Sequence, residues 1–179
     1  MPALPSVSQL NRMPPATFAE SVAPLFERAP RFLARLARAR PFDRMTTLFR
    51  ASRRITREMS GDEQIELLNA HPRIGADPNA VSPLSYTEQG YDRAPAQADA
   101  AIARRLHELN EAYEARFGFR FVIFVAGRPR SAIIPILEEA LTAERDHELR
   151  RGLEDVVSIA EDRLRTLRAG AGPRPTIGA

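Results

Sequence analysis

The 179-residue sequence contains no cysteine, no tryptophan and no lysine, so all 26 of its basic residues are arginines. Without cysteine there is no disulfide framework, no thiolate metal site and no cysteine nucleophile. Without lysine there is neither a Schiff-base amine nor the lysine of a phosphate-binding loop. Any chemistry must therefore come from histidine, carboxylates, arginine and hydroxyl groups.

Long hydrophobic runs are also missing, since no apolar stretch approaches the roughly 20 residues that a transmembrane helix needs. The N-terminus lacks the basic segment and apolar core of a secretory signal. The sequence pI of about 10.1 reflects arginine in place of lysine, because 23 acidic residues leave a net charge of only +3. We therefore expect a cytoplasmic protein with no membrane span and no nucleic-acid partner.

Hydrophobic residues recur at steps of three and four along most of the chain, which predicts amphipathic helices. We expect an all-α single domain of about seven or eight helices over residues 10–168, between a disordered lead-in (residues 1–9) and a disordered tail (residues 169–179). One short extended segment interrupts the helices, because residues 119–125 are rich in β-branched and aromatic side chains. A single strand cannot form a sheet, so no α/β fold is expected.

A histidine occurs where one of these helices must stop. Ser60 and Glu63 form a capping box that begins the helix, and Pro72 disfavours helical conformation at His71. The imidazole should therefore lie beside unpaired helix carbonyls, whose partial negative charge favours the protonated ring. His71 could be a catalytic residue or simply a C-terminal cap, and its position alone favours neither role.

The segment after His71 is long for a loop in a compact domain, which indicates either function or disorder over residues 72–95. It carries Glu88 and Gln89, a carboxylate and an amide that could converge on the imidazole for proton transfer and for holding a polar substrate. Taken alone, a glutamate in a loop is more often solvated. The pairing with His71 is what makes this loop a candidate site.

Arg163 is a third candidate, because it borders the apolar stripe of the last helix and can reach inward. A planar, permanently charged guanidinium suits an anionic substrate. The alternatives are a side chain that extends to solvent and an ion pair with Glu161, Asp162 or a neighbouring helix.

Several other kinds of site find no support. His107 and His147 are not spaced from His71 as metal ligands are, so we expect no metal. The sequence also contains no G-x-S-x-G, no G-x-G-x-x-G and no G-x-x-x-x-G-K motif, which removes the hydrolase, dinucleotide and nucleoside-triphosphate interpretations.

Short motifs then follow one another in an order and spacing that chance is unlikely to produce: His71-Pro72-x-x-Gly75, Ser85-x-x-Glu88-Gln89, Leu109-Asn110-x-x-Tyr113, Phe117-Gly118-Phe119-x-Phe121-Val122 and Ile159-Ala160-x-x-Arg163-Leu164. Through them, from about Leu10 to Leu167, the sequence resembles the OHCU decarboxylase family. OHCU is 2-oxo-4-hydroxy-4-carboxy-5-ureidoimidazoline. The resemblance implies an all-helical enzyme, commonly a homodimer, that needs no cofactor and converts OHCU to (S)-allantoin in the last step of urate degradation.

The resemblance also implies roles for individual residues. His71 and Glu88 would be the catalytic pair, Arg163 would hold the substrate, and Ser85 and Gln89 would bind its polar edges. His71 would engage the hydroxyl and carboxylate region, while Glu88 would orient the substrate and take part in protonation on one face. Which of the two delivers the proton stays open.

The remaining implied contacts come from two short stretches. Pro72 would shape the turn that presents His71. The backbone around Phe119, Phe121 and Ile123 would line the pocket, where its amides could bond the substrate. An extended segment amid helices would then have a function.

One departure from the family pattern lies beside the histidine. The commonest family form is His-Pro-Asp-Leu-Ala-Gly, whereas this chain reads His71-Pro72-Arg73-Ile74-Gly75-Ala76. The charge reversal at Arg73 suggests either a divergent member acting on a related carboxylated ureido heterocycle or a side chain that points to solvent. From a different class, a non-enzymatic helical adaptor with arginine-rich faces is a further alternative, which salt-dependent nucleic-acid binding would favour.

Overall fold

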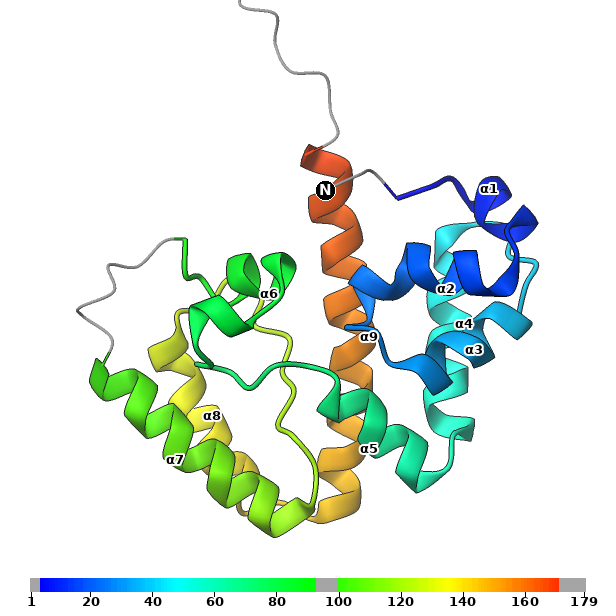
Figure 1. Ribbon diagram of the computed structural model, residues 1–179. Coiled ribbons are helices and arrows are strands. Elements are labelled where there is room, and N and C mark those ends of the chain that lie inside the picture. Colours follow the sequence, from blue (N-terminus) through cyan, green and yellow to red (C-terminus); the bar gives the residue numbers. More distant parts are fainter. Residues whose placement is uncertain (1–3, 93–99, 171–179) are drawn as a thin grey trace, which may run out of the picture.

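The computed structural model describes residues 4–92 and 100–170, which contain nine α-helices and no β-strand (Figure 1). The expectation of an all-α domain is thus confirmed. Over these residues no helix is long and apolar enough to cross a membrane. The helices are α1 (Val7–Arg12), α2 (Pro15–Val22), α3 (Pro30–Arg38), α4 (Met45–Glu58), α5 (Gly61–Asn69), α6 (Pro83–Glu88), α7 (Ala100–Phe117), α8 (Ile133–Ala140) and α9 (Arg145–Gly170).

The two short helices α1 and α6 explain why the count exceeds the seven or eight that were expected. Each has six residues, fewer than two turns, so neither shows a helical period in the sequence. α1 begins after a capping box of Ser6 and Gln9, which places residues 7–9 in a helix although a disordered lead-in was expected there. Residues 1–3 and 171–179 of the expected lead-in and tail lie outside the described residues.

The long helix α9 runs through the centre of the molecule (Figure 1). α4 and α5 pack against it directly, and α2, α3 and α4 pack successively on one another. On the other side of α9, α7 pairs with α8 (Figure 1). The predicted apolar stripe of α9 is buried at Leu153, Val156, Ala160 and Leu164, and Val157 is buried beside it. The core therefore lies around α9, and any residue at the edge of its stripe faces several other helices.

The expected extended segment is present between α7 and α8, and it has no neighbouring strand among the described residues. Its backbone polar groups are bonded by side chains instead. The Arg151 guanidinium on α9 donates to the carbonyl oxygen of Val122 at 2.8 Å, and the carboxylate of Asp155 accepts from the N–H of Phe124. An extended segment without a partner strand is tolerated here because side chains of α9 bond some of its backbone polar groups.

Candidate functional site

A cavity of about 420 Å³ lies between the end of α5, helix α6, the extended segment and α9. This volume is typical of sites for small molecules. The residues that line it include His71, Pro72, Glu88, Gln89, Ile123 and Arg163. Three segments far apart in the sequence thus contribute polar groups to one space.

His71 reaches this cavity because α5 ends just before it. The predicted capping box is confirmed, since Ser60 and Glu63 bond each other's backbone N–H at the start of α5. The regular helix ends at Asn69, and the N–H of His71 donates to the carbonyl oxygen of Leu68 at 3.1 Å. Pro72 follows and joins His71 in the cavity wall.

The His71 ring is buried and adopts one tautomer. Its Nδ1 lies 3.0 Å from the backbone carbonyl oxygen of Leu67, and a carbonyl oxygen can only accept a hydrogen bond. Nδ1 therefore carries the proton of the neutral ring, and Nε2 keeps its lone pair. Nε2 is buried and has no hydrogen-bond partner among the described residues. A free basic nitrogen in a cavity wall is available to a ligand.

The ring is neutral at physiological pH. The Leu67 carbonyl favours the protonated form, as expected, but does not decide the charge state. Burial of the imidazole and the nearby positive charge of Arg163 lower the pKa of His71 to about 4, although the Glu27 carboxylate and the Leu67 carbonyl oppose this shift. One carbonyl dipole does not offset the loss of water around the ring. At physiological pH His71 is therefore uncharged, with a lone pair on Nε2.

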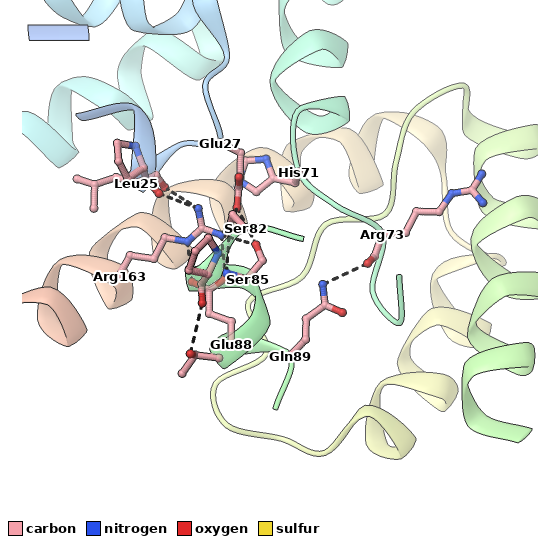
Figure 2. A network of polar contacts seen from close by, with 12 residues as sticks. Leu25, Glu27, His71, Arg73, Ser82, Ser85, Glu88, Gln89 and Arg163 are labelled. Atoms are coloured by element: carbon pink, nitrogen blue, oxygen red, sulfur yellow. Dashed lines mark hydrogen bonds and ion pairs between the residues drawn. The ribbon is translucent and has the colours of Figure 1, made fainter. Parts of the chain in front are cut away.

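Arg163 projects from α9 into the interior, as its place beside the apolar stripe predicted. Only 1% of its side chain is exposed. Its Nε donates to Oε1 of Glu88 at 2.7 Å and its Nη2 donates to Oε2 at 2.9 Å, so the two side chains form a bidentate pair (Figure 2). Arg163 and Glu88 both line the cavity that contains His71.

Glu27 also pairs with Arg163, although it was not among the candidates from the sequence. Its Oε1 accepts from Nη2 of Arg163 at 2.7 Å, from the hydroxyl of Ser85 at 2.7 Å and from the hydroxyl of Ser82 at 2.8 Å (Figure 2). Glu27 lies 136 residues before Arg163, so no local motif could indicate the pair. The one weak signal was a carboxylate directly after the apolar pair Leu25 and Phe26.

The two carboxyl groups on this guanidinium differ in acidity. For Glu27, burial raises the pKa, but Arg163 and the two serine hydroxyls outweigh burial, so the pKa lies below its ordinary value. For Glu88, burial dominates and the pKa lies above its ordinary value, even though Arg163 opposes the rise. The site therefore contains one carboxylate that stays charged and one carboxyl group that protonates more readily.

Ser85 and Gln89 are occupied by other parts of the protein. The Ser85 hydroxyl accepts from Nη2 of Arg163 at 2.9 Å while donating to Glu27, and Ser85 is not among the residues that line the cavity. The Gln89 side chain accepts from the N–H of Gly75 at 2.8 Å and donates to the carbonyl oxygen of Arg73 at 3.2 Å. Gln89 does line the cavity, but its amide also ties α6 to the turn after His71.

Residues 121–127, which comprise the end of the extended segment and the turn that follows it, border the cavity. Phe121 and Ile123 line it, as the resemblance implied, whereas Phe119 does not. The Phe119 ring instead packs against Tyr113 and Phe117, with ring centroids 5.8 and 6.0 Å apart. The residues that face the site therefore begin two positions later than expected.

No group of three or more histidine, cysteine, aspartate or glutamate side chains in residues 4–92 and 100–170 is arranged to hold a metal ion. His107 lies 3.3 Å from the carboxylate of Glu111 on the exposed face of α7. The described histidines are thus distributed among separate surroundings, and only His71 lines the cavity.

With this geometry in place, comparison with known proteins assigns the chain to a family. Residues 11–165 match the sequence profile described as OHCU decarboxylase. The chain belongs to the OHCU decarboxylase family. A 2-oxo-4-hydroxy-4-carboxy-5-ureidoimidazoline decarboxylase of Haloferax volcanii is 32% identical over 163 residues, which are 89% of this chain and 94% of that protein.

A longer relative and two solved structures are similar to the same region. The uric acid degradation bifunctional protein PucL of Bacillus subtilis is 29% identical over 89% of this chain, which spans 32% of that protein. A crystal structure of an OHCU decarboxylase in the presence of (S)-allantoin has a TM-score of 0.63 at 23% identity and covers 79% of this chain and 92% of its own. A crystal structure of (S)-allantoin synthase has a TM-score of 0.64, also at 23% identity, over 91% of this chain and 54% of its own. Both structures share the fold.

Arg73, the departure from the pattern of the OHCU decarboxylase family, points away from the cavity (Figure 2). Its guanidinium donates to both carboxylate oxygens of Glu114 on α7, at 2.8 and 2.7 Å. Arg73 is not among the residues that line the cavity. The side chain is therefore engaged in a partly exposed ion pair rather than in the site.

Proposed function

We propose that this protein decarboxylates OHCU to (S)-allantoin, without a cofactor, and that His71 and Glu88 are its catalytic pair. Membership of the OHCU decarboxylase family supports the reaction class. The observation that carries the proposal is the neutral His71 ring, whose unpartnered Nε2 lies in the wall of a cavity shared with Glu88 and Arg163. A candidate base, His71, and a candidate acid, Glu88, thus line the same cavity.

The reaction defines what such a site must do. In OHCU a hydroxyl and a carboxyl group share ring carbon 4, and the ureido group is on ring carbon 5. When the bond to the carboxyl group breaks, carbon dioxide leaves and the electron pair moves into the ring, where a ring nitrogen can carry it. The hydroxyl then becomes the carbonyl of allantoin, and carbon 5 gains a proton on one face.

His71 supplies the base in this scheme. Nε2 accepts the proton of the hydroxyl on carbon 4 as that hydroxyl becomes the carbonyl of allantoin. The resulting imidazolium returns its proton to the ring nitrogen that received the electron pair. Because the pKa of His71 is lowered to about 4, the ring begins each cycle neutral at physiological pH.

Glu88 supplies the acid. Its carboxyl group protonates more readily than an ordinary glutamate because burial raises its pKa, and it lies in the cavity wall. It gives a proton to carbon 5 on one face, which makes one enantiomer, and regains a proton from water. One proton is consumed per carbon dioxide released from the substrate carboxylate, so the cycle balances.

Arg163 and the cavity wall orient the substrate. The guanidinium N–H groups already have acceptors in Glu88, Glu27, Ser85 and the backbone carbonyl oxygens of residues 24 and 25, so its attraction for the substrate carboxylate is mainly that of a nearby positive charge. Pro72, Gln89 and the backbone at Phe121 and Ile123 would bound the ring and its ureido group. Ser85 would act through Arg163 and Glu27 rather than on the substrate.

The deciding assay uses circular dichroism to follow OHCU that has been generated freshly from urate. We expect the purified protein to accelerate loss of OHCU and to yield optically active allantoin, whereas spontaneous decay is slower and gives a racemic product. An unchanged rate or a racemic product would refute the proposed activity. The homodimer and the cytoplasmic location implied at the outset stay predictions, which sedimentation and fractionation can test.

The charge reversal at Arg73 is the one feature of the sequence that suggests a second substrate. The ion pair with Glu114 takes that side chain away from the cavity, so it does not favour a different substrate. A panel of related carboxylated ureido heterocycles would detect one. We expect OHCU to be the preferred member of the panel.

A further inference from the structure

Two carboxyl groups share one buried guanidinium in this site, and only one of them borders the cavity. Glu27 and Glu88 each lie 2.7 Å from a nitrogen of Arg163. Glu88 is among the residues that line the cavity, whereas Glu27 is not. The two carboxyl groups therefore hold the same charge, but only Glu88 borders the cavity.

We propose that Glu27 is a positioning residue, which stays charged against Arg163 and thereby leaves Glu88 as the carboxyl group that exchanges protons. This inference rests on the proposed function, and it assigns a role to a residue that the catalytic pair does not include. Glu27 would act through its neighbours Arg163, Glu88 and His71 rather than on the substrate, because it does not border the space where the substrate would lie.

Hydrogen bonding distinguishes the two carboxyl groups. A single oxygen of Glu27 accepts from Arg163, Ser82 and Ser85. Three donors on one oxygen favour the ionised form strongly. Glu88 receives its two hydrogen bonds from Arg163, which is already neutralised by Glu27. A proton that enters the site should therefore settle on Glu88.

Counting charges leads to the same division. With Arg163 positive, His71 neutral and both carboxyl groups ionised, the site has a net charge of −1. An anionic substrate would make the net charge of this buried site −2, which is costly in a low dielectric. Protonation of Glu88 relieves the excess, so substrate binding itself would load the acid that the reaction needs.

The backbone around Glu27 is shaped to hold this arrangement. Glu27 and Arg28 have φ angles of 50° and 57°, in the left-handed region that residues with a side chain rarely adopt. In the same turn, the carbonyl oxygens of Pro24 and Leu25 accept from Nη1 of Arg163 at 3.0 and 3.5 Å. Two successive strained residues, with two carbonyls aimed at one guanidinium, indicate a turn built to present Glu27.

The groups that could titrate with Glu88 come from three parts of the fold. Arg163 and Asp162 lie on α9, His71 follows α5, and Glu27 precedes α3. His71 is already neutral, and Arg163 stays charged throughout the accessible pH range. Asp162 also lines the cavity and raises the pKa of Glu88, but less than Glu27 does, and it pairs with Arg165 at 2.7 Å. Glu27 is therefore the negative charge whose removal should affect Glu88 most.

The test replaces Glu27 with glutamine, which keeps the shape and an accepting oxygen but removes the charge. Carboxyl carbon NMR on the full chain, without substrate, should show Glu88 protonating at a pH lower by about one unit, because Glu88 becomes the only counter-ion of Arg163. In the OHCU assay kcat should fall roughly tenfold at neutral pH, because lowering the midpoint of Glu88 protonation by one pH unit leaves tenfold less protonated Glu88. The change in KM should be much smaller. Glu27→Asp keeps the charge, so the pH at which Glu88 protonates should return part of the way to its wild-type value.

Glu66→Gln is the matched control, because Glu66 pairs with Arg31 outside the cavity. In this variant the titration of Glu88 and the activity on OHCU should equal those of the wild type. If Glu27→Gln loses stability but leaves the Glu88 titration and the pH profile unchanged, Glu27 is only structural and the proposal is overturned. If that variant does not fold, Glu27→Asp decides by the same titration. A wild-type protein inactive on OHCU would refute the proposed function, while the substrate-free titration would still decide the role of Glu27.

Discussion

Nδ1 of His71 lies 3.0 Å from the backbone carbonyl oxygen of Leu67, one helical turn earlier in α5. This contact holds the proton on the nitrogen that faces the helix and leaves the lone pair on Nε2, in the wall of the cavity. The end of α5 therefore determines which nitrogen of His71 a substrate meets. A base is prepared by backbone geometry rather than by a neighbouring carboxylate.

The neutral state of His71 predicts a specific dependence of stability on pH. The unfolded histidine binds a proton near pH 6.5 and the folded one near about pH 4, so the unfolded state holds more protons between these values. The free energy of unfolding should therefore fall by roughly 3 kcal/mol as pH drops from 6.5 to 4. His71→Gln should lack this component in urea titrations across that range. Equal slopes for the two proteins would show that His71 is not buried as a neutral ring.

Arg120 should act on His71 through the backbone. Its Nη1 donates to the carbonyl oxygens of Asn69 and His71, both at 2.8 Å, and its backbone N–H donates to the Asn69 side chain at 2.9 Å. Arg120→Met would leave the carbonyl groups after α5 without these donors, so we expect a loss of roughly 1–3 kcal/mol of stability and about tenfold in kcat. Arg150→Met, at an exposed site on α9, is the control and should change neither. Loss of stability with unchanged kcat would mean that Arg120 does not help to orient the ring.

Gly75 and Gly90 provide a matched test of the turn after His71. Both have a positive φ, of 78° and 73°, but a methyl group on Gly75 would meet Leu106 at 2.9 Å, whereas one on Gly90 meets nothing within 4 Å. Gly90→Ala should cost about 1 kcal/mol of stability from backbone strain alone. Gly75→Ala should cost a further 1–3 kcal/mol or so because the Leu106 side chain on α7 must move aside. Equal losses in urea unfolding would contradict the close approach of this turn to α7.

The ion pair of Arg73 and Glu114 should matter little for activity. The pair is partly exposed, so Arg73→Gln should cost at most about 1 kcal/mol of stability. We expect kcat/KM for OHCU to stay within about twofold, because the side chain does not line the cavity. Glu114→Gln should behave in the same way. A tenfold change in substrate preference in Arg73→Gln would instead support the divergent-substrate alternative.

Features that depend on neighbours in sequence could be predicted well. The Ser60 capping box and the stripe of α9 were confirmed, because each is determined by residues within a few turns. The positions of His71, Glu88 and Arg163 around one cavity also agree with the sequence hypothesis. Helices of six residues, such as α6, could not be recognised because they are shorter than the period that reveals a helix.

Features that depend on tertiary burial could not be predicted in the same way. The neutral charge state of His71 could not be predicted, because the local carbonyl that favours protonation was visible in the sequence while the loss of solvent and the charge of Arg163 were not. The pair of Glu27 and Arg163 joins segments 136 residues apart, and the turn that permits it has left-handed residues without glycine. Phe119 was displaced from the cavity by its packing on Tyr113, which no spacing rule specifies.

The most direct test of the account compares the wild type with His71→Gln in the circular dichroism assay on freshly generated OHCU. If the free Nε2 of His71 is the base, the variant should lose at least about a hundredfold in kcat, with its helical content intact, while the wild type forms optically active allantoin. A His71→Gln protein that still makes optically active allantoin at the wild-type rate would contradict the central claim.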